Sequence, residues 1–164
     1  MIIHAFDGSR IACALLSDGV GATLAASAFV PYYTYTGGSL AVAGSVSPMS
    51  TSGTTQTFAW SLSGVDPLCS SGAGTAGNSC GIHIHSGTTC TADAGGHYYE
   101  TSTVTSDPWT SVAYTSDGSG VSTGSAVVTT GGSSSDVALS ALEGAGVGCA
   151  CGRGGMSVVA CAEC

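Results

Sequence analysis

The sequence predicts an all-β protein, an antiparallel Greek-key β-sandwich or barrel. Gly, Ser, Thr, Val, Ala and Tyr make up most of its 164 residues, whereas the helix formers Lys, Gln, Glu and Met are scarce. Short apolar or alternating runs are separated by turn residues, which is typical of antiparallel strands. The predicted fold ends in a loop-rich tail that contains cysteines.

The N-terminal strands are predicted first. Residues 2–4 (IIH) and 11–16 (IACALL) look like strand pieces of a segment 1–16, joined by a tight turn at Asp7-Gly8. Residues 17–38 are expected to form a linker. The linker contains an aromatic cluster, which we expect either to lie on a neighbouring unit or to form part of the domain's rim. Its tyrosines are Tyr32, Tyr33 and Tyr35.

Residues 39–137 are predicted to form the sandwich itself. Residues 39–46 (SLAVAGSV) look like a half-buried strand, and residues 48–55 are expected to form a turn. Residues 56–65 place three large apolar side chains on alternate positions, which puts them on one face of a strand. These side chains are Phe58, Trp60 and Leu62.

The next elements are a Gly/Ser loop, a short strand, a long loop and two strands that flank a turn. The Gly/Ser loop covers residues 68–79, the short strand residues 81–85 and the long loop residues 90–99. The two strands cover residues 110–116 and 121–130. The sequence Asp117-Gly118-Ser119-Gly120 lies between the last two strands and is a strong hairpin signal.

The tail, residues 138–164, is Gly/Cys-rich and weakly patterned, and Ala138 to Leu142 could make one helical turn. Its cysteines could form two disulfides or ligate a soft metal. The abrupt change in composition is also consistent with a divergent final repeat or a reading-frame error. The four cysteines are Cys149, Cys151, Cys161 and Cys164.

Composition excludes several functions. The net charge is −8 and the only cationic side chains are Arg10 and Arg153, so no basic patch for nucleic acid or anionic lipid can form. No apolar run is long enough to enter a membrane as a spanning helix. Asp7 and Arg10 interrupt the N-terminus, which is therefore not a signal peptide; we expect a removed signal or a start inside a longer precursor. Eight cysteines predict disulfides and a secreted, extracellular protein, and the less favoured alternative is a cytosolic metal protein.

The four histidines predict a metal site. His83 and His85 are two residues apart on a predicted strand, so both imidazoles face one side. His97 follows across a loop that can fold back. Three converging imidazoles suit Zn, Cu, Ni or Fe. The alternative is that these histidines only form hydrogen bonds in loops.

These residues resemble the Cu/Zn superoxide dismutase family. GIHIHSG, followed by a cysteine and then GGHYY, is similar to that family's copper-binding segment. IIHA and GSRIACALL, at residues 2–5 and 8–16, are similar to its last strands. The resemblance spans roughly residues 1–16 and 39–137.

The resemblance implies copper ligands at His4, His83, His85 and His97, and an Arg10 that holds superoxide by charge-assisted hydrogen bonds. It also implies one disulfide between Cys13 and Cys90, and a second that closes a local loop between Cys69 and Cys80.

Two departures from the family pattern matter. The loop after His97 has no histidine, so the resemblance is to the copper-only branch and no zinc is expected. The motifs of residues 1–16 come first here, whereas in the family they come last. Either the domain is circularly permuted, or the chain is one unit of a repeat whose strands complete a neighbour, which would give a filament of copies.

The resemblance thus implies a secreted copper-only superoxide dismutase-like protein, whose catalytic residue would be Arg10. The alternative is an extracellular structural subunit that forms a filament or coat by donor-strand exchange, with a vestigial or junction-stabilising copper site. Copper binding or storage without turnover is a third possibility.

Overall fold

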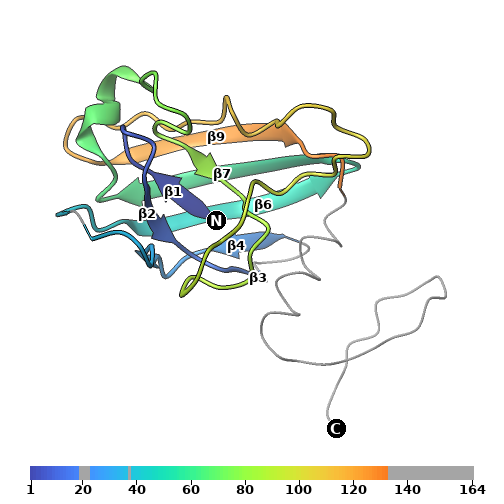
Figure 1. The fold of residues 1–164 in the computed structure, drawn as a ribbon, viewed down its shortest axis with the longest axis horizontal. Helices are drawn as coiled ribbons and strands as arrows, with labels where there is room; N and C mark the ends of the chain where they lie inside the picture. Colours follow the sequence, from blue (N-terminus) through green and yellow to red (C-terminus); the bar gives the residue numbers. More distant parts are fainter. Residues whose placement is uncertain (19–22, 37, 133–164) are drawn as a thin grey trace, which may run out of the picture.

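The computed structural model describes residues 1–18, 23–36 and 38–132. These residues form two antiparallel sheets, with strand orders β5-β2-β1-β8 and β3-β4-β6-β7-β9 (Figure 1). The all-β sandwich that the sequence predicts is confirmed, and the Greek-key connection stays a prediction. The elements are β1 (Ile2–His4), β2 (Arg10–Cys13), β3 (Leu16–Asp18), β4 (Leu24–Ala26), β5 (Val30–Pro31), β6 (Ala43–Ser52), β7 (Thr55–Ser63), the 3-10 turn η1 (Pro67–Ser71), β8 (Ile82–His83) and β9 (Ser122–Thr129).

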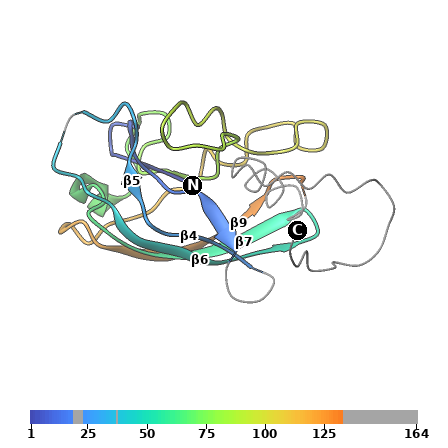
Figure 2. The same ribbon diagram turned by 90° about the horizontal axis from the view of Figure 1, so that it is seen from below.

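The core lies between the two sheets. Side chains of β7 alternate between buried and more exposed, and the buried ones include Phe58, Trp60 and Leu62, as predicted. They share one apolar cluster with Ile3 and Ile11 of the smaller sheet. Figure 2 shows the five-stranded sheet as one layer, with the N-terminus and the long loops together on one face of it. Burial of this apolar surface is the main force that holds the layers together.

Strand β6 differs from the prediction. The expected strand at 39–46 and turn at 48–55 are replaced by one strand that runs to Ser52 and turns at Gly53. Pro48 lies inside this strand, at a register shift between Val46 and Met49. A bulge removes the need for the backbone N–H that proline lacks, so the strand continues past it.

The expected linker 17–38 carries strands. Strand β4 pairs with β6, and β5 pairs with β2, so this segment adds to both sheets. Its residues have weak apolar patterning because each of these strands is only two or three residues long.

The expected strand at 110–116 is not formed. That stretch is mainly turn and loop, with one isolated bridge between Ala113 and Gly81. Strand β9 is confirmed within 121–130, but it pairs along its length with β7, so DGSG does not close a hairpin between the two predicted strands. Asp117 instead accepts hydrogen bonds from the amides of Ser119 and Val121, which makes a tight turn before β9.

The N-terminal strands complete the smaller sheet of their own chain. Strand β1 lies between β2 and β8, with Ile2 opposite Cys13 on one side and His83 on the other. The turn between β1 and β2 needs Gly8, whose φ is +84° and whose missing side chain leaves room for the carbonyl of Gly77. The strands of residues 1–16 are thus paired within their own chain, and the circular permutation stays a prediction.

Predictions for the tail lie outside the described residues. They are the helical turn at 138–142 and the pairing of Cys149, Cys151, Cys161 and Cys164.

Candidate metal centre

All four histidines of the chain meet in one cluster. His4 ends β1, His83 ends β8, and His85 forms an isolated antiparallel bridge with His97. One ring nitrogen from each histidine lies within 4.8 Å of the others. His4, His83 and His85 are 1%, 1% and 7% exposed, so most of the cluster is inside the protein.

Local backbone structure brings the rings together. Strand β8 is shorter than the predicted strand 81–85, yet the rings of His83 and His85 stack 6.3 Å apart, as the spacing of two predicts. The amide of His4 donates to the carbonyl of Gly81, which aligns β1 beside them. Gly81 must lack a side chain, because a Cβ there would collide with the imidazole of His83.

One nitrogen of each ring faces away from the cluster and donates a hydrogen bond. The acceptors are Gly8 O for His4 Nδ1 (2.9 Å), Val112 O for His83 Nε2 (2.8 Å), Gly95 O for His85 Nδ1 (2.9 Å) and an Asp107 carboxylate oxygen for His97 Nδ1 (2.6 Å). A carbonyl or carboxylate only accepts, so each bond fixes the tautomer of its ring. The lone pair is then on the nitrogen that faces inward.

Three of the four inward nitrogens lack a partner among the described residues. His4 Nε2, His83 Nδ1 and His85 Nε2 are buried with no hydrogen bond from the described residues. Buried polar atoms without a partner are costly and rare, and a metal ion would satisfy all of them. Two nitrogens on opposite sides of one ion are about 4 Å apart, because metal–imidazole bonds are about 2.0–2.1 Å long. A spread of 4.8 Å therefore fits one ion after a small shift.

The electrostatics also suit a cation. Burial lowers the pKa of His4 to about 4 and that of both His83 and His85 to about 3. These three rings are therefore neutral near pH 7, and a neutral imidazole is the form that binds a metal.

Arg10 lies directly beside the cluster. It is the register partner of His4 across β1 and β2, and its Nη2 donates to Gly95 O at 2.7 Å. The same carbonyl accepts from His85 Nδ1, so one peptide group joins Arg10 to a candidate ligand. The predicted position of Arg10 beside the histidines is thus observed.

Three polar residues of the site were missed by the sequence reasoning. Asp107 holds His97, and Asp93 and Tyr32 bind the guanidinium of Arg10 at 2.7 Å each. For Tyr32 the sequence predicts only an aromatic cluster, either on a neighbouring unit or at the domain's rim. The two aspartates are in loops, where no periodicity indicates which way a carboxylate points.

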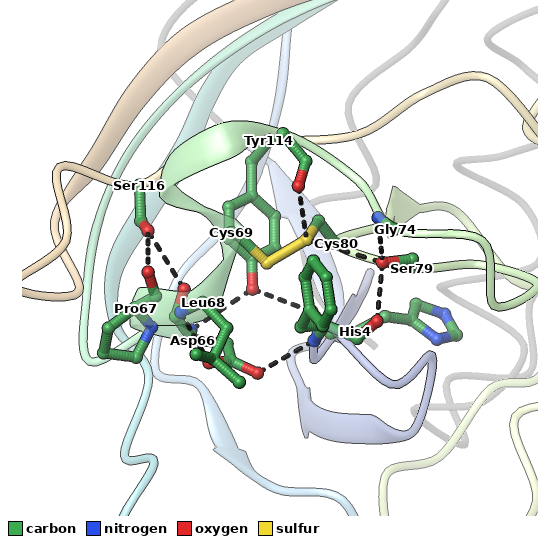
Figure 3. Close-up of a disulfide and its surroundings, with 12 residues drawn as sticks. His4, Asp66, Pro67, Leu68, Cys69, Gly74, Ser79, Cys80, Tyr114 and Ser116 are labelled. Atoms are coloured by element: carbon green, nitrogen blue, oxygen red, sulfur yellow. Dashed lines mark hydrogen bonds between the residues drawn. A yellow bond between two sulfur atoms is a disulfide. The ribbon is translucent and has the colours of Figure 1, made fainter.

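Two disulfides fix the site's surroundings, with the pairing that the resemblance implied. Cys13–Cys90 ties β2 to the loop that carries Asp93, and Cys69–Cys80 closes the loop before β8. The Cys80 amide donates to Ala5 O, and the Tyr114 hydroxyl donates to His4 O at 2.8 Å. Figure 3 shows this disulfide packed beside His4 and Tyr114. The second disulfide thereby supports the strand end that carries His4.

The fold and the site define an all-β, disulfide-containing protein with a buried four-histidine cluster that could hold a metal ion. No protein-family model, curated protein or solved structure matches the chain. The two disulfides fit an extracellular protein. Across the described segments there is no helix long and apolar enough to cross a membrane.

Proposed function

We propose that the protein is a secreted, copper-dependent superoxide dismutase. The observation that carries this proposal is the set of buried, unpartnered imidazole nitrogens around one point. Imidazole suits copper, zinc, iron and nickel, and among divalent first-row ions copper binds such sites most tightly. All four histidines belong to this one set, so none is left for a separate zinc site.

The reaction needs one electron to move in each of two steps. Bound copper would supply a Cu(II)/Cu(I) couple, so that one superoxide loses an electron to become O2, and a second gains an electron and two protons to become H2O2. The chain's part is to hold four imidazoles in fixed orientations around the metal. Asp107 orients His97, and backbone carbonyls orient the other three rings.

Arg10 would bind the anionic substrate. A guanidinium has five N–H groups. Three of those of Arg10 donate to Tyr32, Asp93 and Gly95. Within the described residues, one N–H on Nη2 and the Nε–H have no acceptor and would donate to a small anion beside the cluster. The net charge of −8 gives little long-range attraction, so we expect modest rather than diffusion-limited turnover.

The test is superoxide consumption by copper-loaded protein from which loosely bound copper has been removed. We expect wild-type protein and the control Thr57→Ala, which changes an exposed position on β7, to be active. His4→Ala should lose at least tenfold in rate because one ligand is gone. Equal activity in His4→Ala and wild-type protein would overturn the proposal. Polymers that purify without metal would instead favour the structural subunit.

A further inference from the structure

Arg10 is the only Lys or Arg side chain within residues 1–18, 23–36 and 38–132. Among the described residues, this guanidinium is thus the one cationic side chain available to a small anion that reaches the histidine cluster. Its placement is firm, because the carbonyl of Gly95 accepts from both Arg10 and His85. The charge that this guanidinium presents is then set by what else surrounds it.

A carboxylate partly cancels that charge. Asp93 Oδ1 accepts from Arg10 Nη1 at 2.7 Å, from the Tyr32 hydroxyl at 3.1 Å and from the Gly95 amide at 3.1 Å. The Arg10 side chain is 27% exposed and that of Asp93 is 70% exposed. Asp93 is therefore the more solvent-exposed member of the pair, and its carboxylate is in direct contact with the guanidinium.

Tyr32 holds the guanidinium independently of Asp93. Its hydroxyl accepts from Arg10 Nη1 at 2.7 Å and from the Ala94 amide at 3.1 Å, and the residue is only 3% exposed. Loss of the Asp93 charge would thus leave Arg10 held by two partners, Tyr32 and Gly95. An ion pair as exposed as this one adds little to the stability of the fold. Its main effect is therefore on the charge that Arg10 presents to an anion.

We propose that Asp93 is a residue that tunes anion binding: it lowers the affinity of the histidine site for small anions by offsetting the charge of Arg10. This inference rests on the proposed function, since the anion concerned is the class of substrate proposed for the same centre. A site tuned in this way would retain Arg10 for orienting superoxide while holding small monoanions, superoxide included, only weakly.

The experiment is a titration of the copper(II)-loaded full chain with azide, a small linear monoanion, followed by visible absorption. Asp93→Asn keeps an oxygen acceptor but loses the charge, and we expect it to bind azide roughly threefold to tenfold more tightly at low salt. The difference should shrink at about 1 M salt, where screening is strong. Asp93→Glu restores the charge and should return azide affinity toward the wild-type value.

The double variant ties the effect to Arg10. If Asp93 acts through the guanidinium, Asp93→Asn should gain much less affinity in an Arg10→Gln background. Unchanged or weaker azide binding in Asp93→Asn would overturn the proposal. If azide binding does not tighten in Asp93→Asn but the protein is an active dismutase, the inference fails and the proposed function stands. If azide affinity depends on Asp93 but the protein has no dismutase activity, the inference stands and the proposed function fails. Failure to bind copper at the histidines overturns both.

Discussion

At the scale of single residues, the site is organised by the nitrogen of each ring that faces away from it. His83 uses Nε2 for its outward hydrogen bond and so presents Nδ1, whereas the other three rings present Nε2. Backbone carbonyls accept three of these bonds, and no substitution can remove a carbonyl. Asp107 is the exception, because it is a side chain that a single mutation can change.

Asp107→Asn should weaken copper binding about 10-fold to 100-fold, as loss of such supporting partners usually does. Asp107 Oδ1 accepts from the Trp109 amide, so an asparagine that keeps this bond would turn its amide group toward His97 and disfavour the required tautomer. Competition with a chelator of known affinity measures the effect. Asp117→Asn, at an exposed turn before β9, is the matched control, and equal affinities for both variants would contradict the assigned role.

Acid should destabilise the metal-free protein. The pKa values of His4, His83 and His85 are lowered from 6.5 to between about 3 and 4, chiefly by burial, so below pH 6.5 the unfolded chain binds more protons than the folded one. Stability therefore falls as pH drops from about 6.5 toward 4. Urea unfolding at pH 7.5 and pH 5 measures this, and His85→Gln should flatten the dependence. A metal-free protein equally stable at both pH values would contradict the burial of neutral rings.

The sequence indicated the histidines and Arg10 because their spacing and motif are local. His83 and His85 share a face by simple periodicity, and His4 and Arg10 belong to a recognisable segment. Asp93, Asp107 and Tyr32 could not be predicted, because their roles depend on how three separate loops fold over the sheet.

At the scale of elements, the loop between η1 and β8 is a support for β1. It is closed by Cys69–Cys80, and the Cys80 amide and the Gly81 carbonyl bond the backbone of Ala5 and His4. Tyr114 adds a bond to the carbonyl of His4 from the other side. The loop therefore links a disulfide to the position of one candidate ligand.

Replacing both Cys69 and Cys80 with serine should lower the free energy of unfolding by about 2–4 kcal/mol, as expected for a disulfide that closes a short loop. Copper affinity should also fall, because His4 loses part of its support. Urea unfolding and chelator competition measure the two effects, with Ser70→Ala in the same loop as control. Unchanged copper affinity in the double variant would show that the loop does not position His4.

Elements were predicted well where alternation is strong and poorly where it is weak. The alternation of Phe58, Trp60 and Leu62 identified β7, whereas β9 was predicted from the turn signal of residues 117–120 that precedes it. Pro48 suggested a turn because a proline normally ends a central strand, whereas here a bulge absorbs it. The strands of 17–38 are too short for any periodicity to appear.

At the scale of the whole molecule, the order of the motifs has a structural explanation. Strands β1 and β2 form the middle of the smaller sheet in their own chain. The site therefore combines His4 and Arg10, from the N-terminal end, with His83, His85 and His97, which lie more than 70 positions later in the sequence. Donation of these strands to a neighbour would build the same sheet between two chains.

A complementation experiment separates the two arrangements. His4→Ala and His83→Ala each lack one candidate ligand, and the two variants are unfolded, mixed and refolded together. Strands paired within each chain predict no recovery of the four-histidine site, whereas exchanged strands would rebuild it in mixed assemblies. Copper uptake above that of either variant alone would therefore contradict the arrangement seen here.

The most direct test of the central claim is copper stoichiometry together with electron paramagnetic resonance of the copper(II)-loaded full chain. We predict one copper per chain, with hyperfine structure from imidazole nitrogens that changes in His4→Ala. A chain that binds no copper with all four histidines intact, or whose spectrum and stoichiometry are unaltered by His4→Ala, would contradict a four-histidine metal centre.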